Sequence, residues 1–290
     1  MCEPATAIRD IMTITDDPLL RPLIFGILLI LFAVCERLLP RRALTHGRIS
    51  RWSGNLGVLV IGSIVARAIL PVAPIGVAIW AQRQDVGLFN VIDIPVLLAG
   101  ILAFLMLDLW IYAQHRLFHW APLLWRLHRM HHTDMDLDVT SGLRFHPLEL
   151  LLSLILKIIA VCALGVPPVA VVVFEIVLNA TSMFNHSNLA LPLKLDAALR
   201  LIVVTPDMHR VHHSIRPRET NSNFGFNIPW WDRLFGTYVS EPVDSHTSMT
   251  IGLPIFRDHR ATRLKQLLIQ PFIEDREAAN NKGGEETPPP

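Results

Sequence analysis

Eight of the thirteen histidines in this 290-residue chain lie in three motifs whose spacing restricts how the chain can fold, and a ninth, His186, stands alone. HRMHH and HRVHH both place histidines at offsets 0, 3 and 4, and HRLFH places two histidines four residues apart. Residues three and four apart share one face of a helix, so each motif is predicted to present its imidazoles together from a helix. The nine are His115, His119, His128, His131, His132, His186, His209, His212 and His213.

This number of histidines predicts a metal centre with two ions. Neutral imidazole is the commonest nitrogen ligand of transition metals, and about four to six ligands complete one ion. Surface histidines can cluster by chance in one motif, but three motifs with repeated spacing argue against chance. All-imidazole coordination suits iron, zinc, copper and nickel alike, so the ligand type alone leaves the metal open.

The composition predicts that this centre belongs to an all-α integral membrane protein. Hydrophobic residues make up 51% of the chain and charged residues 18%, and the mean hydropathy is +0.41, which is too apolar for an ordinary soluble domain. A net charge of +1 without a basic stripe argues against nucleic-acid binding. Five apolar runs predict about four to five membrane helices or hairpins, at residues 19–39, 55–81, 91–113, 148–164 and 169–180.

Two of these regions have distinctive breaks. Residues 55–81 contain Pro71 and Pro74 and also carry Arg67, which predicts a kinked or partly re-entrant span. The GVPP turn between the last two runs predicts a tight hairpin that dips into the bilayer. Lys157 and Glu175 lie at nearly equal depth on its two arms, so an ion pair between them is expected, unless they face a polar headgroup.

The chain is expected to have three parts. Residues 1–90 form N-terminal membrane helices, residues 91–260 a catalytic domain with a helical cap that holds the histidines, and residues 261–290 a segment ending in a disordered tail. Residues 97–119 contain no helix breaker, so the first motif is predicted to extend a membrane helix out of the bilayer.

Loop charges predict which side of the membrane the histidines face. Four arginines lie at residues 40–54, whereas acidic residues predominate before the first run. Since Lys and Arg are retained on the cytoplasmic side, this loop and all nine histidines are predicted to be cytosolic, provided that residues 55–81 cross fully.

The order of the motifs HRLFH, HRMHH, RFHPLE, NHSN, PDMHRVHHS and WDRLFGTY resembles the fatty acid hydroxylase and sterol desaturase superfamily over roughly residues 90–240. This resemblance implies a non-haem diiron centre that uses O2 and two electrons to hydroxylate or desaturate a lipid. It implies that the nine histidines are the ligands and that His146 is a possible further one. Zinc could replace iron in a purified sample. The implied location is a bacterial inner membrane, or the endoplasmic reticulum of a eukaryote.

Asp108 is the first choice for a carboxylate that orients a ligand histidine. It lies seven residues before His115 on the same predicted helix face, and a ligating imidazole usually donates its second N–H to an oxygen atom. The alternative is a helix-end carboxylate that faces water or pairs with Arg116. Glu149 beside His146 and Asp207 beside His209 are weaker candidates of the same kind.

Two other features receive structural interpretations. Asp134, Asp136 and Asp138 alternate as in a calcium loop, but Val139 and Phe145 replace the required Gly and Glu, so a calcium site is not predicted. Trp230 and Trp231 are expected to pack the cap or mark the membrane interface.

No dinucleotide, haem or iron–sulfur motif appears, so a separate reductase or electron carrier is expected as partner. The other partner is a membrane lipid, which could be a sterol, a fatty acid or a related lipid. The sequence does not give the oligomeric state. Two alternatives remain. A metal-dependent membrane hydrolase is disfavoured because the motifs lack a carboxylate, and a non-catalytic metal-binding or transport protein is disfavoured because the ligands gather on one side.

Overall fold

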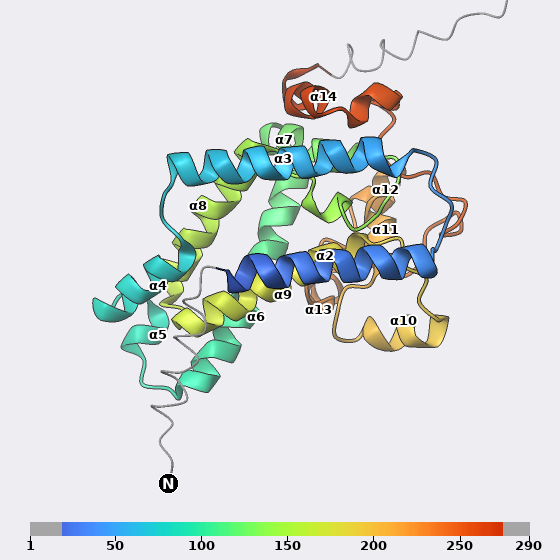
Figure 1. Ribbon diagram of the computed structural model, residues 1–290. Coiled ribbons are helices and arrows are strands. Elements are labelled where there is room, and N and C mark those ends of the chain that lie inside the picture. Colours follow the sequence, from blue (N-terminus) through green and yellow to red (C-terminus); the bar gives the residue numbers. More distant parts are fainter. Residues whose placement is uncertain (1–18, 275–290) are drawn as a thin grey trace, which may run out of the picture.

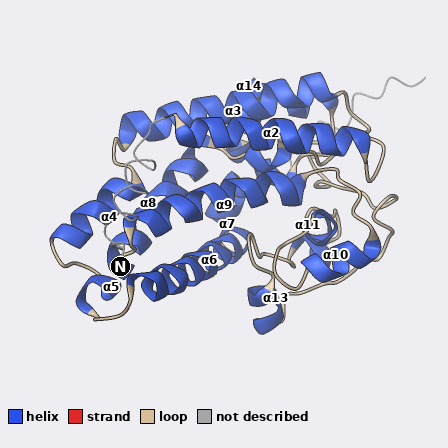
Figure 2. Cartoon of the chain, turned by 60° about the horizontal axis from the view of Figure 1, so that its bottom comes forward, coloured by secondary structure: helices blue, strands red, loops and turns tan. Residues whose placement is uncertain are grey.

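A computed structural model describes residues 19–274, which form a helical bundle with a compact cap of short helices at one end (Figure 1). Within these residues the only β-type pairings are two isolated bridges, so helices and loops account for the described chain (Figure 2). The prediction of an all-α fold is confirmed. The predicted disordered tail lies largely outside the described residues.

Four segments of residues 19–274 are long and apolar enough to cross a membrane. This agrees with the lower end of the expected four to five. They are Arg48–Val91, which comprises α3 (Arg48–Ile69), α4 (Pro74–Arg83) and α5 (Leu88–Val91), and the three helices α6 (Val96–Trp120), α8 (Pro147–Leu164) and α9 (Pro168–His186).

The first apolar run forms α2 (Leu20–Leu38), but this helix is not among the four. Three of its 19 residues are charged, namely Arg21, Glu36 and Arg37. Glu36 is fully buried and accepts hydrogen bonds from two backbone N–H groups, so this end of α2 is anchored in protein. The helix is confirmed, but its assignment as a full crossing is not supported.

The predicted breaks occur where prolines interrupt the apolar runs. α3 ends at Ile69 and α4 starts at Pro74, because Pro71 and Pro74 cannot donate helical hydrogen bonds. The turn between α8 and α9 contains Gly165 with φ +63°, a left-handed conformation that ends α8. The turn between the two arms is confirmed, but the arms do not pack on each other as a tight hairpin, because α4 packs against both. The second arm is also longer than expected, since α9 continues to His186.

The ion pair predicted across this hairpin is also confirmed. Lys157 Nζ lies 3.3 Å from Glu175 Oε1. The sequence did not reveal a second cation at this carboxylate, since Arg21 Nη1 lies 2.8 Å from Glu175 Oε2. α2 is thereby attached to α9 by charge as well as by packing.

Packing joins the helices before residue 90 to those after it. α3 packs against α8, α2 against α9, and α4 against both arms of the hairpin. The largest apolar cluster draws Ala78, Leu107, Val161 and Phe174 from α4, α6, α8 and α9. α4 and α5 lie at the opposite end of the bundle from the small cap helices α10 to α13 (Figure 1).

The remaining helices are short and build the cap or cover α3. They are α7 (Pro122–His132), α10 (Leu193–Leu199), α11 (Pro206–His212), α12 (Pro217–Thr220), α13 (Trp230–Leu234) and α14 (Leu264–Ile269), with 3₁₀ turns at Ser141–Leu143, His259–Thr262 and Gln270–Phe272.

Candidate metal centre

Four helices bring the nine predicted histidines together. α6 carries two of them one turn apart, α7 carries three near its C-terminal end, α9 ends at one, and α11 supplies two before the ninth follows directly. All nine fall into two groups whose possible ligand atoms lie within 4.8 Å of one another. One group is His115, His119, His128, His132 and His212; the other is His131, His186, His209 and His213.

The two groups are neighbours in space. The rings of His132 and His213 stack across the boundary with centroids 4.5 Å apart, and those of His209 and His212 lie 5.1 Å apart. This arrangement matches the predicted pair of adjacent ions, with five possible ligands for one and four for the other.

Four backbone carbonyls and one carboxylate fix the orientation of five of the rings. Each Nδ1 faces an acceptor, which requires that Nδ1 carry the proton and that Nε2 of the neutral ring keep its lone pair. The pairs are His115 with Phe224 O at 2.8 Å, His128 with Glu149 Oε1 at 2.6 Å, His131 with Arg144 O at 3.3 Å, His186 with Ser182 O at 2.7 Å and His212 with Ser222 O at 2.7 Å.

The resulting Nε2 contacts are those expected around a cation. Nε2 of His131 lies 3.0 Å from Nε2 of His186, and Nε2 of His115 lies 3.2 Å from Nε2 of His128. With both Nδ1 atoms protonated, no hydrogen is available between these nitrogens, and two lone pairs face each other. Two nitrogen ligands at about 2.1 Å from one metal ion are separated by about 3.0–3.4 Å at ordinary coordination angles. The residues present therefore fit a metal ion in each group.

The electrostatics keep the ligands neutral. Burial, followed by the neighbouring imidazoles, holds the pKa of His132 and of His213 well below the usual value. A neutral ring is the form that binds metal. Among the described residues, Nε2 of His212 and Nε2 of His213 are buried without a hydrogen-bond partner, as expected for atoms reserved for ions.

The carboxylate that orients a ligand is Glu149 and not Asp108. The buried Asp108 accepts hydrogen bonds from Trp231 Nε1 at 2.8 Å and from Ile228 N at 3.3 Å, so it holds the cap in place. Glu149, which the sequence placed beside His146, instead contacts His128. Trp231 packs the cap as expected, through Asp108.

Two further candidates also lie away from the ligand rings. His146 is the N-cap of α8, with Nδ1 accepting from Leu148 N at 3.2 Å and Nε2 lying 3.2 Å from Leu268 O. It belongs to neither histidine group. Asp207 forms ion pairs with Arg41 at 2.9 Å and with Arg210, so it links the cap to the loop after α2.

A backbone segment that local sequence rules did not reveal supports the ligands from the cap. Asp232 of the WDRLFGTY motif accepts hydrogen bonds from the N–H groups of Phe224 and Gly225 at 2.8 and 2.7 Å. Phe224 in turn offers its carbonyl to His115. Burial raises the pKa of Asp232 to about 6. The WDRLFGTY motif could have suggested that Asp232 supports the backbone near the ligands, because this single acid lies close to a glycine, at which the chain can turn.

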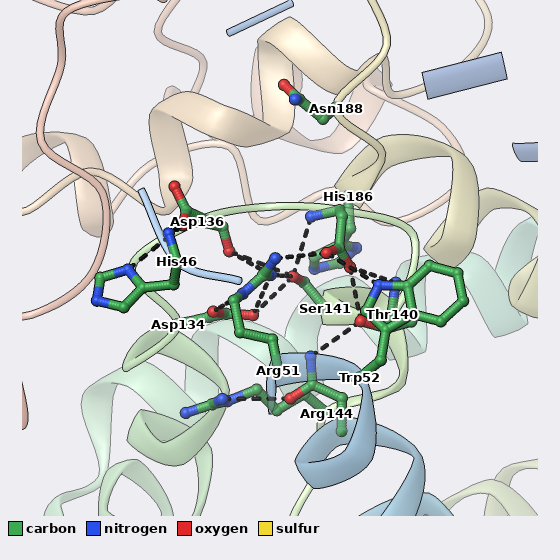
Figure 3. A network of polar contacts seen from close by, with 12 residues as sticks. His46, Arg51, Trp52, Asp134, Asp136, Thr140, Ser141, Arg144, His186 and Asn188 are labelled. Carbon is green, nitrogen blue, oxygen red and sulfur yellow. Dashed lines mark hydrogen bonds and ion pairs between the residues drawn. The ribbon is translucent and has the colours of Figure 1, made fainter. Parts of the chain in front are cut away.

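A buried arginine network holds the loop after α7, as Figure 3 shows. Arg51 of α3 contacts Asp134 through Nε at 2.9 Å and Nη2 at 2.8 Å, and its Nη1 contacts Asp138. The same loop carries Arg144, whose carbonyl accepts from His131. The alternating aspartates therefore bind Arg51 and backbone N–H groups, which agrees with a structural role.

The sequence profile described as "Fatty acid hydroxylase" matches residues 100–237, which contain all nine histidines. Over this segment the chain is similar to the fatty acid hydroxylase family. The resemblance recognised from the order of the motifs is confirmed.

Relatives of this chain are named as lipid-oxidising enzymes. The chain is 32% identical to ornithine lipid hydroxylase OlsE of Rhizobium tropici over 178 residues, covering 61% of this chain and 51% of the relative. It is 34% identical to alkylglycerol monooxygenase of Xenopus tropicalis over 142 residues, 48% of this chain and 30% of the relative. It is 26% identical to cholesterol 25-hydroxylase of Rattus norvegicus over 184 residues, 63% and 61% of the two chains.

The match thus spans about half of OlsE and less than a third of the alkylglycerol monooxygenase. No solved structure gave a significant match.

A cavity of about 310 Å³ adjoins the two histidine groups. His115, His128 and His131 line it, together with side chains from α3, α6, α8 and α9. Its walls therefore come from the four segments that are long and apolar enough to cross a membrane.

Proposed function

We propose that this protein is a membrane-bound non-haem diiron oxygenase that hydroxylates or desaturates a lipid with O2. One observation carries the proposal: two adjacent groups of neutral histidines adjoin a cavity walled by candidate membrane helices. The names of the relatives support oxidation of a lipid.

Two iron ions held by the histidine groups would supply the oxidising power, with O2 and two electrons, that no side chain possesses. The chain positions and shields this centre. Glu149 and the carbonyl of Phe224 keep the Nδ1 protons of two rings in place, so that each Nε2 points inward. Phe118 and Leu150 line the adjoining cavity and limit access of water. Zinc fits the same ligands, which makes it a useful redox-inactive substitute.

Electrons are proposed to come from a separate reductase or carrier protein, because the sequence lacks motifs for a nucleotide, haem or iron–sulfur group. The second partner is the membrane lipid itself.

We also propose that the metal centre faces the cytosol. The arginine-rich loop after α2 contacts the cap directly, through Arg41 with Asp207 and through Arg42 with the carbonyl of Met249 at 2.8 Å. The loop and the centre therefore share one side, and positive residues favour the cytosolic side. This support does not depend on how many segments cross. The proposed membrane is a bacterial inner membrane, or the endoplasmic reticulum if the source is eukaryotic.

The test compares lipid extracts from cells with and without the protein by mass spectrometry. We expect lipids that gain one oxygen atom or lose two hydrogens. His131→Ala and His212→Ala remove one ligand from each group, so both are expected to abolish the change. His146→Asn is the matched control, since it keeps an N-cap at α8 and lies outside both groups. Activity retained in both ligand variants contradicts a shared site.

An anaerobic assay separates the alternatives. Product formed without O2 rejects the oxygenase and favours a metal-dependent membrane hydrolase. An iron-loaded protein that changes no lipid, with O2 and reductant present, favours a non-catalytic metal-binding or transport protein.

A further inference from the structure

The cavity beside the histidine groups is mostly apolar, and apart from Ser63, Asn179 and Ser182 and the histidines its polar side chains form a strip on α6 and α8. Gln114 precedes the histidine ligand His115 on α6, and α8 contributes Glu149, Ser153 and Lys157. The three residues of α8 are four apart, so they share one face and are spaced by about 6 Å along the helix axis. Since Glu149 contacts His128, Ser153 lies about one turn from the metal centre.

Gln114 and Ser153 form a pair with an unused hydrogen-bonding atom. Gln114 Nε2 donates to Ser153 Oγ at 2.9 Å. Gln114 Oε1 is buried and has no hydrogen-bond partner among the described residues. A buried carbonyl without a partner lowers stability, so its presence calls for a ligand or another function. If the Gln114 side-chain amide is flipped, its NH2 group and its oxygen exchange positions. The unpaired atom is then a hydrogen-bond donor, so the pair still offers one polar atom to a ligand.

Further polar side chains line the cavity beyond this pair, on the side away from the metal centre. Lys157 lines the cavity one turn beyond Ser153, and its partner Glu175 is shared with Arg21. Two cations therefore share one carboxylate at this end. A cavity made for hydrocarbon alone has no use for these groups, because each costs free energy in an apolar environment.

We propose that Gln114 and Ser153 bind a hydroxyl, amide or ester group of the lipid and so determine specificity. Such a group supplies the missing partner of the Gln114 amide. Gln114 lies next to His115, and Ser153 lies one helical turn from Glu149, which contacts His128. A lipid whose polar group binds this pair therefore has its neighbouring carbon atoms at the metal centre. The enzyme then selects lipids that are oxidised close to a polar group, and discriminates against plain methylene chains. This inference names the substrate class of the proposed function and rests on it.

The test is equilibrium binding to the full chain in phosphatidylcholine nanodiscs, with both sites loaded with zinc and without O2. The radiolabelled probes are 1-O-hexadecylglycerol, hexadecanamide and octadecane. We expect at least one of the two polar probes to bind at least about threefold more tightly than octadecane. Gln114→Met and Ser153→Ala are each expected to weaken binding of that probe by about three- to tenfold and to leave octadecane unchanged.

The control is Leu154→Met, an apolar cavity residue on the same helix, which is expected to preserve the preference. Two zinc ions per chain in every variant verify that the centre is intact. The inference is overturned if neither polar probe is preferred, or if the substitutions at Gln114 and Ser153 leave the preference intact or weaken all probes equally. Because zinc performs no oxidation, failure of the oxygenase proposal leaves this measurement unaffected, and failure here leaves the oxygenase proposal standing.

Discussion

Replacing Glu149 is expected to weaken the binding of one of the two metal ions and to leave the binding of the other unchanged. Its Oε1 lies 2.6 Å from His128 Nδ1, and the two side chains are 3% and 4% exposed. A hydrogen bond to a charged group contributes about 1.5–3 kcal/mol, and one between neutral groups about 0.5–1.5 kcal/mol. Glu149→Gln therefore loses about 1 kcal/mol, or roughly fivefold in metal affinity, and Glu149→Ala about 2 kcal/mol, or roughly thirtyfold.

The assay is chelator competition followed by elemental analysis of the metal bound per chain. His128 belongs to the group of five histidines, so both variants are expected to lose one ion early and to retain the ion of the four-histidine group. Asp108→Asn is the control, because Asp108 is equally buried but contacts Trp231. The reasoning is refuted if Glu149→Ala retains both ions as tightly as the wild type, or if Asp108→Asn loosens metal more.

Three further predictions concern the supports of the centre. Arg51→Met leaves two buried aspartates without their cation and is expected to destabilise the fold by about 3–5 kcal/mol in thermal unfolding; a loss below about 1 kcal/mol contradicts this. Gly142→Ala places a Cβ 2.4 Å from Ser182 O, the acceptor of a ligand ring, so we expect a loss of about 1–3 kcal/mol and weaker metal binding in the four-histidine group, whereas unchanged binding argues against this contact. Asp232 has a folded-state pKa raised to about 6, so its stability contribution is complete below about 4 and lost as pH rises through 6. Stability of the wild type relative to Asp232→Asn should therefore fall by about 2 kcal/mol between pH 4 and 6, and a flat difference contradicts the burial effect.

Local spacing was sufficient to predict that the histidines of the three motifs gather and which helices carry them. Offsets of three and four residues bring imidazoles to one helix face whatever the surrounding packing. The continuous helix into His119 also follows from the sequence, because residues 97–119 contain no helix breaker. The turn at Gly165 follows from the GVPP motif.

The supports of the ligands could not be predicted in this way. Asp108 shares a helix face with His115, but seven residues of helix separate them by about 10 Å, too far for a hydrogen bond. Glu149 reaches His128 from another helix, so only tertiary packing reveals the contact. Arg51 was counted as a loop charge, yet it is buried in α3 against aspartates 83 and 87 positions away.

The two groups of histidines also have a consequence for how the chain is held together. One group contains both His115 and His212, and the other both His131 and His213. Each ion therefore acts as a cross-link that closes a loop of roughly 80–100 residues, and in the chain-entropy model a covalent link over such a loop contributes about 4–5 kcal/mol. Proteolysis of the cap is expected to accelerate when metal is withdrawn. The amount of intact protein in a cell should then follow the supply of the bound metal, and not its activity alone.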